Sequence, residues 1–113
     1  MAAGAAGGPG IDEASAVVWV GGVMMPKRVI YEGRVQGVGF RYTCKDIARG
    51  YDVTGGVRNL ADGTVELVAC GEAGEVEDFL REIEEDSAVS HHIKSARAED
   101  VEPPGTTGFQ ILR

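Results

Sequence analysis

The sequence has few cysteines and few basic residues. Only two of its 113 residues are cysteines, Cys44 and Cys70, which lie far apart without Cys-x-x-Cys spacing or companion histidines. This pattern argues against a disulfide framework and a zinc site, and favours reduced thiols in a cytoplasmic protein. A net charge of −7 leaves no broad basic face, which argues against a protein that binds the nucleic-acid backbone.

The sequence also lacks a long hydrophobic run. The apolar stretch AVVWVGGVMM, at residues 16–25, is too short to span a bilayer. The segment before it has no basic residue and carries Asp12 and Glu13, which is the wrong flank for an export signal. We therefore expect a cytoplasmic protein that does not bind a membrane.

The first 26 residues differ in composition from the rest of the chain. They begin with the Ala/Gly-rich sequence MAAGAAGGPG, which has little apolar surface to bury. We expect a flexible tail at residues 1–26 and one compact domain at residues 27–113. The content of 43% hydrophobic and 26% charged residues suits a single small globular domain.

Two kinds of hydrophobic spacing alternate within residues 27–113. Stretches rich in β-branched residues predict strands, and apolar residues at i, i+3, i+4 and i+7 predict helices. Asp62-Gly63 predicts a tight hairpin between the second and third strands. The predicted strands cover residues 28–35, 52–59, 64–70, 92–101 and 109–113, and the predicted helices cover residues 42–51 and 75–86.

This order, βαββαβ with a short fifth strand, predicts the fold. Two helices with one apolar face each need one sheet to pack on, and an antiparallel sheet can bury one side and expose the other. We predict a ferredoxin-like α+β sandwich, with an antiparallel sheet backed by two helices. Glu84, Glu85 and Asp86 near the end of the second helix oppose the helix dipole, for no reason evident in the sequence.

The stretch GRVQGVGFR, at residues 33–41, joins a predicted strand to a predicted helix. Four basic residues and one acid lie between Lys27 and Arg41, a local charge of +3 in an acidic chain. Glycines let backbone amides approach an anion, the helix adds free N–H groups, and Arg41 can bind two phosphate oxygens. The stretch lacks the features of a P-loop or a dinucleotide-binding fingerprint. From these residues alone, an anion site and a plain tight turn both remain open.

The same stretch resembles the first signature of the acylphosphatase family, Gly-x-Val-Gln-Gly-Val-x-Phe-Arg, at every specified position. GGVRNLADGTV at residues 55–65, with Gly71, is similar to the second signature, a Gly-aromatic-Val-Arg/Lys-Asn stretch followed by a glycine hairpin and a valine. Gly56 replaces a residue that is usually aromatic, so we expect looser packing beside Asn59. The resemblance covers about residues 27–113, and the family's five-stranded sheet with two helices agrees with the predicted fold.

The resemblance implies hydrolysis of the carboxyl–phosphate bond of small-molecule acyl phosphates, with no metal, no cofactor and no covalent intermediate. It implies that Arg41 binds the phosphate and that Asn59 orients the attacking water. An amide is not a base at neutral pH, so the proton of the water would pass to the substrate or product phosphate. The residues that the resemblance assigns to phosphate binding are Gln36, Gly37, Val38, Gly39, Phe40 and Arg41.

The sequence also allows other interpretations. A protein of the same fold could bind phosphate or carbamoyl-like anions for a partner without hydrolysing them. RNA binding is disfavoured by the acidic charge and the lack of a Lys/Arg-Gly-Phe-aromatic stretch, and we expect a monomer that binds no nucleic acid. Cys44 is interpreted as a core residue, and His91-His92 as the solvated start of a strand with its rings on opposite faces. Arg34 and Arg58 are interpreted as solvated strand residues that could touch the acyl group of a substrate.

Overall fold

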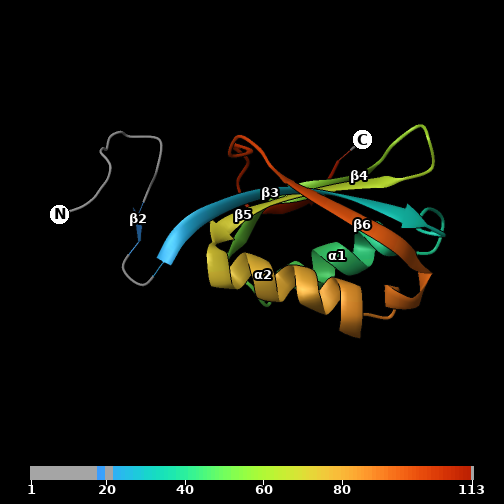
Figure 1. The fold of residues 1–113 in the computed structure, drawn as a ribbon. Coiled ribbons are helices and arrows are strands. Elements are labelled where there is room, and N and C mark those ends of the chain that lie inside the picture. The colour runs from blue at the N-terminus through green and yellow to red at the C-terminus, as the bar shows by residue number, and fades with distance from the viewer. Residues whose placement is uncertain (1–17, 20–21, 113) are drawn as a thin grey trace.

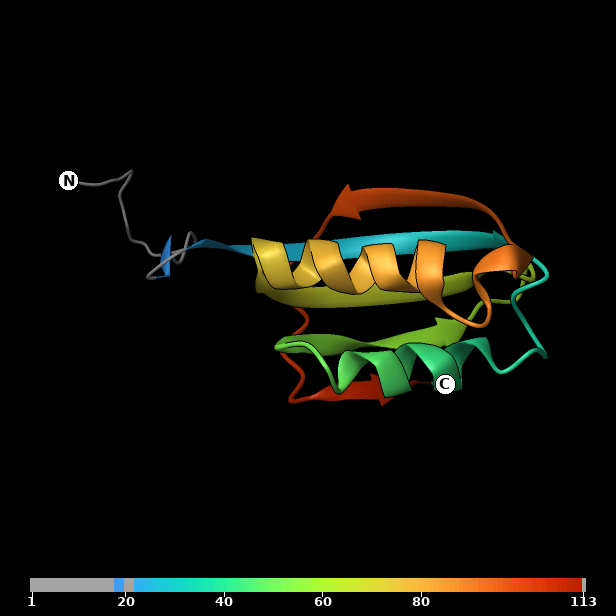
Figure 2. The ribbon, with the colours of Figure 1, turned by 90° about the horizontal axis from the view of Figure 1, so that it is seen from below.

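A sheet covered on one face by two helices makes up the described part of the chain, residues 18–19 and 22–112 of the computed structural model (Figure 1). This arrangement confirms the predicted ferredoxin-like α+β sandwich. Figure 2 shows the helices side by side, with α1 packed on β4 and β7 and α2 packed on β3 and β5. The elements are β2 (Val18–Trp19), β3 (Gly22–Gly33), α1 (Phe40–Ala48), β4 (Val53–Asn59), β5 (Val65–Glu72), α2 (Ala73–Arg81), β6 (Ile93–Asp100) and β7 (Phe109–Ile111).

The long part of the sheet has the strand order β6–β3–β5–β4–β7, the two-residue β2 pairs with the beginning of β3, and one strand runs in an unpredicted direction. The pairs among β6, β3, β5 and β4 are antiparallel, but β7 is parallel to β4, with Val57 opposite Ile111. The prediction of a wholly antiparallel sheet is therefore wrong for the last strand. The reason is that residues 101–108 cross from one edge of the sheet to the other before β7 begins, so β7 ends near the end of β4.

The first long strand, β3, begins earlier than predicted. Met24, Met25 and Pro26 pair with Glu72, Gly71 and Cys70 of β5. The prediction of a flexible tail at residues 1–26 is therefore wrong for residues 22–26, which belong to the sheet. Val18 and Trp19 of β2, also within the predicted tail, pair with β3, and residues 1–17 and 20–21 lie outside the described residues.

The core lies between the sheet and the helices. Each helix contributes two fully buried residues to this core: Phe40 and Cys44 from α1, and Val76 and Phe79 from α2. The rings of Tyr31 and Phe40 lie 5.3 Å apart, so the first residue of α1 is fixed on β3 by an aromatic contact. The predicted core position of Cys44 is thus confirmed by its burial.

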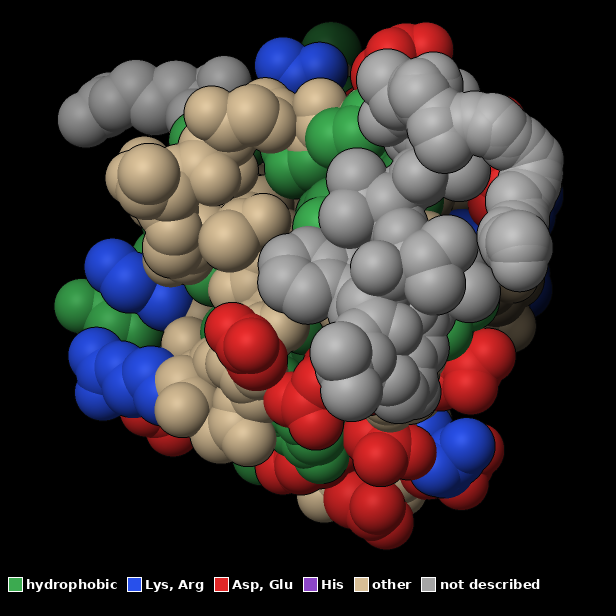
Figure 3. Space-filling model, turned by 90° about the vertical axis from the view of Figure 1, so that its left-hand side faces the viewer, with side chains coloured by type: hydrophobic (Ala, Val, Ile, Leu, Met, Phe, Trp, Pro, Cys, Tyr) green, Lys and Arg blue, Asp and Glu red, His purple; other side chains and the backbone are tan. Residues whose placement is uncertain are grey.

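The acidic end of the second helix has hydroxyl partners. After α2 the chain continues as a π-helical turn, η1 (Glu82–Asp86). The hydroxyl of Tyr31 donates to Glu84 Oε2 at 2.9 Å, and that of Tyr51 donates to Glu82 Oε1 at 2.7 Å. These hydrogen bonds stabilise carboxylates at a place where the helix dipole disfavours them. At the other end of α2, where the helix begins, the dipole favours acids. Acidic side chains gather in the lower part of the view in Figure 3.

Gly56 is covered by the end of the chain. A methyl group at Gly56 would lie 2.7 Å from Leu112 Cδ1 and 2.9 Å from the carbonyl oxygen of Gln110. Leu112 thus occupies the space that a larger side chain at residue 56 would need, and its amide donates to the carbonyl of Val57 at 2.8 Å. The looser packing expected beside Asn59 is thus not found at Gly56, whose missing side chain leaves no gap.

Candidate active site

The loop between β3 and α1 has a backbone that requires glycine at two positions. Gly37 and Gly39 have φ angles of 78° and 80°, in the left-handed region that other residues rarely adopt. A methyl group at either residue would meet no atom within 4 Å, so the backbone angle, and not crowding, explains the glycines. Both glycines are exposed and line a cavity next to this loop.

The start of α1 presents free amide groups. The first backbone hydrogen bond of the helix runs from the amide of Thr43 to the carbonyl of Gly39, at 2.9 Å. The amides of residues 37–42, which precede it, have no acceptor within the described chain. The N-terminus of a helix carries a partial positive charge and donors that point outward. This junction can therefore bind an anion.

A cavity of about 280 Å³ lies at this junction and brings together residues that are distant in the sequence. Arg41 at the start of α1 and Asn59 at the end of β4 both line it. The full lining consists of Val35, Gly37, Gly39, Phe40, Arg41, Tyr42, Asn59 and Ile111.

Two residues of the predicted phosphate loop do not line the cavity. The side chain of Gln36 donates from Nε2 to the carbonyls of Leu60 and Thr64, at 2.8 and 2.9 Å. It therefore fastens the loop to the β4–β5 hairpin that follows Asn59. The side chain of Val38 packs against the core.

The predicted hairpin after Asn59 is present and is held by its own side chains. Asp62 accepts hydrogen bonds from the hydroxyl and the amide of Thr64, at 2.6 and 3.0 Å. These bonds lower the pKa of Asp62. The hairpin is thus a fixed frame for the loop that Gln36 fastens to it.

Asn59 has an unsatisfied acceptor. Its Oδ1 atom is buried and has no hydrogen-bond partner in the described part of the protein. Buried polar atoms are usually hydrogen-bonded, and those that are not often have a functional role. Because Asn59 lines the cavity, a water molecule there can donate a hydrogen bond to this oxygen.

Arg41 is also without a partner among residues 18–19 and 22–112. Its half-buried side chain makes no hydrogen bond or ion pair there. Four other arginines each pair with a carboxylate, namely Arg28, Arg49, Arg58 and Arg81. The guanidinium of Arg41 is therefore free to bind an anion in the cavity it lines.

Other candidates from the sequence lie outside this cavity. Burial raises the pKa of Cys44 to about 12, so its thiol is not activated as a nucleophile. Arg58 pairs with Glu66 at 2.6 Å on the open face of the sheet, and Arg34 is exposed and does not line the cavity.

The interpretation of the two histidines is wrong in its geometry. They lie in a 3-10 turn, η2 (Ser90–His92), and not on a strand, so their rings are 4.0 Å apart instead of on opposite faces. No cluster of three or more potential metal ligands is found among the described residues.

The sequence did not indicate three residues that line the cavity: Val35, Tyr42 and Ile111. Ile111 reaches it only because β7 runs parallel to β4, a pairing without a local signal. Tyr42 could have been suspected, because a side chain that directly follows Arg41 starts at the same helix terminus.

Comparisons with known proteins agree with this geometry. The acylphosphatase family model matches residues 27–111. An acylphosphatase of Methanospirillum hungatei is 43% identical over 89 residues, which cover 77% of this chain and 98% of that protein. One of Treponema denticola is 39% identical over 83 residues, which cover 74% of this chain and 87% of that protein.

A solved structure is similar over the same region. The crystal structure of acylphosphatase from Bacillus subtilis has a TM-score of 0.71 and 31% identity, and the match covers 80% of this chain and 99% of that one. The family model covers most of the chain, and both relatives are more than 30% identical over about three quarters of it. The chain belongs to the acylphosphatase family, whose enzymes hydrolyse acyl phosphates.

Proposed function

We propose that the 280 Å³ cavity binds the phosphate group of an acyl phosphate and that Asn59 holds the water that attacks it. The observation that carries this proposal is that one cavity holds two groups with no partner among the described residues: the guanidinium of Arg41 and the buried Oδ1 of Asn59. One suits an anion and the other suits a water molecule.

The phosphate is held by charge and by amides. The N–H groups of residues 37–42 and the Arg41 guanidinium donate to the phosphate oxygens. In the loose transition state of phosphoryl transfer, negative charge is spread over these oxygens, so fixed donors stabilise it. This chain supplies that charge from its own residues, and we expect the reaction to need no metal.

The water is positioned and not deprotonated by Asn59. The oxygen of the water attacks phosphorus while the bond from phosphorus to the acyl oxygen breaks, and the carboxylate leaves with the electron pair. A carboxamide cannot accept the proton at neutral pH. The proton therefore goes to a phosphate oxygen, and the products are a carboxylate and inorganic phosphate.

The test is hydrolysis of benzoyl phosphate by the purified protein in EDTA, followed by absorbance. Arg41→Ala should lower kcat/KM by about 10³-fold, because charge stabilisation of the transferred phosphoryl group is lost. Arg81→Ala is the matched control, since Arg81 is exposed on α2 and pairs with Asp78; it should leave kcat/KM unchanged.

Two outcomes would contradict the proposal. Hydrolysis that persists in Arg41→Ala would show that another group binds the phosphate. Binding of inorganic phosphate without any turnover would favour an anion-binding module on the same fold.

A further inference from the structure

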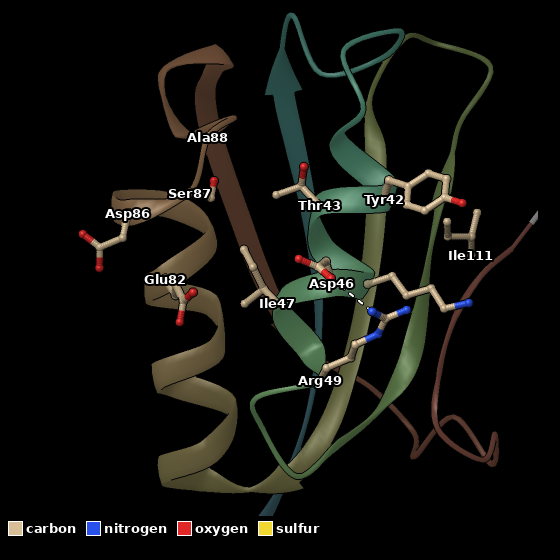
Figure 4. A pocket seen from close by; sticks show the side chains of 11 residues that line it. Tyr42, Thr43, Asp46, Ile47, Arg49, Glu82, Asp86, Ser87, Ala88 and Ile111 are labelled. Atoms are coloured by element: carbon tan, nitrogen blue, oxygen red, sulfur yellow. Dashed lines mark hydrogen bonds and ion pairs between the residues drawn. The ribbon is translucent and has the colours of Figure 1, made fainter.

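A larger cavity, of about 670 Å³, adjoins the proposed phosphate site along α1 (Figure 4). Tyr42 and Ile111 line both cavities, so the two cavities share part of their wall. Figure 4 shows these two side chains on the same side of α1, whereas Glu82 and Asp86 of η1 lie across the helix. A substrate held by its phosphate can therefore extend its acyl group past Tyr42 and Ile111.

Tyr42 is exposed in an unusual way for an aromatic residue. The residue is 75% exposed, and the other large hydrophobic residues between residues 24 and 112 are buried or half-buried. An aromatic ring that lines a cavity offers an apolar surface to the carbon skeleton of a ligand. Ile111, which is half-buried on β7, offers a second one.

Basic residues continue along α1 from the phosphate site. Arg41, Lys45 and Arg49 follow one another at intervals of four residues, so their side chains form one row along the helix. Arg49 pairs with Asp46 at 3.3 Å. Lys45 is half-buried, lines the larger cavity and has no ion pair within the described residues. It is thus a free cation about 6 Å, or one helical turn, beyond Arg41.

We infer that Lys45 binds a second negative charge on the acyl group and so determines specificity. The favoured substrates are then acyl phosphates whose acyl part carries a carboxylate or a phosphate group, with Tyr42 and Ile111 in contact with the carbon atoms between the two anions. This inference rests on the proposed function, because it takes the reacting phosphate to be bound at Arg41.

The experiment compares two substrates that differ only at their far end, 4-carboxybenzoyl phosphate and 4-methylbenzoyl phosphate. The wild-type protein should have the lower KM for the carboxylated substrate. Lys45→Gln should raise that KM by about five- to tenfold, the value of one partly solvated charged hydrogen bond, with little change in kcat. The KM for the methyl substrate should stay constant, and Lys45→Arg should restore the preference.

Lys27→Gln is the control, because it removes the same charge elsewhere. Lys27 lies on β3, six residues before the strand ends, and pairs with Asp100. It should change neither KM. The preference should also weaken as salt is added, since the charge at Lys45 is only half-buried.

The inference is wrong if the wild-type protein shows no preference, or if Lys45→Gln changes both KM values equally. Both results would leave the proposed function intact, because hydrolysis would continue and would still depend on Arg41. Absence of hydrolysis with either substrate would instead reject the proposed function itself.

Discussion

At the scale of a single residue, Glu66 connects neighbouring strands on the open face of the sheet. Its carboxylate accepts hydrogen bonds from Arg28 at 2.5 Å and from Arg58 at 2.6 Å, and Arg28 also donates to Glu99 at 2.7 Å. Partial burial alone would raise the pKa of Glu66, but the bonds from the two arginines outweigh it and the pKa is lowered. The residue therefore links three neighbouring strands, β3, β4 and β5.

Stability should depend on pH through this residue. A pKa that is lower in the folded state means that the stabilisation is complete above the ordinary value of 4.5 and is lost as the pH falls through the lowered pKa. Glu66→Gln should reduce the free energy of unfolding by about 1 kcal/mol at pH 7. Urea unfolding at pH 7 and pH 3 should show that the difference from wild type shrinks at pH 3. An equal difference at both pH values would contradict this assignment.

Residue types in the sequence predicted some contacts but not others. The glycines and Arg41 were identified from their spacing and from the family resemblance. The role of Gln36 was not, because its acceptors, the carbonyls of Leu60 and Thr64, follow it by 24 and 28 residues. Which backbone carbonyls lie within reach of an amide side chain depends on tertiary packing, and a local pattern does not contain it.

The last strand matters most at the scale of elements. The spacing of apolar residues predicted a strand near residues 109–113, and β7 is found at Phe109–Ile111. Its direction could not be predicted, since strand pairing is not local and the preceding connection can cross either end of the sheet. The parallel pairing brings Ile111 to the candidate site and Leu112 onto Gly56.

The contact of Leu112 with Gly56 gives a test of this packing. Gly56→Ala should lower the free energy of unfolding by about 1–3 kcal/mol, because the new methyl group meets Leu112 and the carbonyl of Gln110. In Gly56→Ala combined with Leu112→Ala, the loss should be smaller than the sum of the single losses, because part of the crowding is removed. A double-mutant cycle by urea unfolding measures this coupling.

Gly74→Ala is the control for this cycle. A methyl group at Gly74 would meet only the flexible carboxylate of Glu72, at 3.5 Å, and alanine favours a helix. The free energy of unfolding should therefore stay constant or rise slightly. Additive losses for Gly56 and Leu112 would show that the two residues are not in contact.

At the scale of the whole molecule, the site forms where three strands end. The loop after β3, Asn59 at the end of β4 and Ile111 at the end of β7 meet at one end of the sheet. A guanidinium and amides that have no partner among the described residues gather there, in a chain whose net charge is −7. The overall charge repels anions in general, so binding has to come from these local donors.

At this scale the sequence predicted some residues of the cavity and missed others. The family resemblance named Arg41 and Asn59, and the structure brings both to one cavity. Val35, Tyr42 and Ile111 complete its lining, but they carry no motif, because an apolar wall can be built from any residue that the fold places there. No helix among the described residues has the length and hydrophobicity to cross a membrane.

The central claim, that Asn59 positions the attacking water while Arg41 holds the phosphate, is tested most directly by Asn59→Ala. The buried Oδ1 of Asn59 makes no hydrogen bond within the described residues, so removal of the side chain should leave the urea midpoint nearly constant. With benzoyl phosphate, kcat should fall by about 10²- to 10³-fold, the usual cost of losing a positioned polar group, whereas the inhibition constant of inorganic phosphate should stay within about twofold. A near-wild-type kcat in the Asn59→Ala protein would contradict the account.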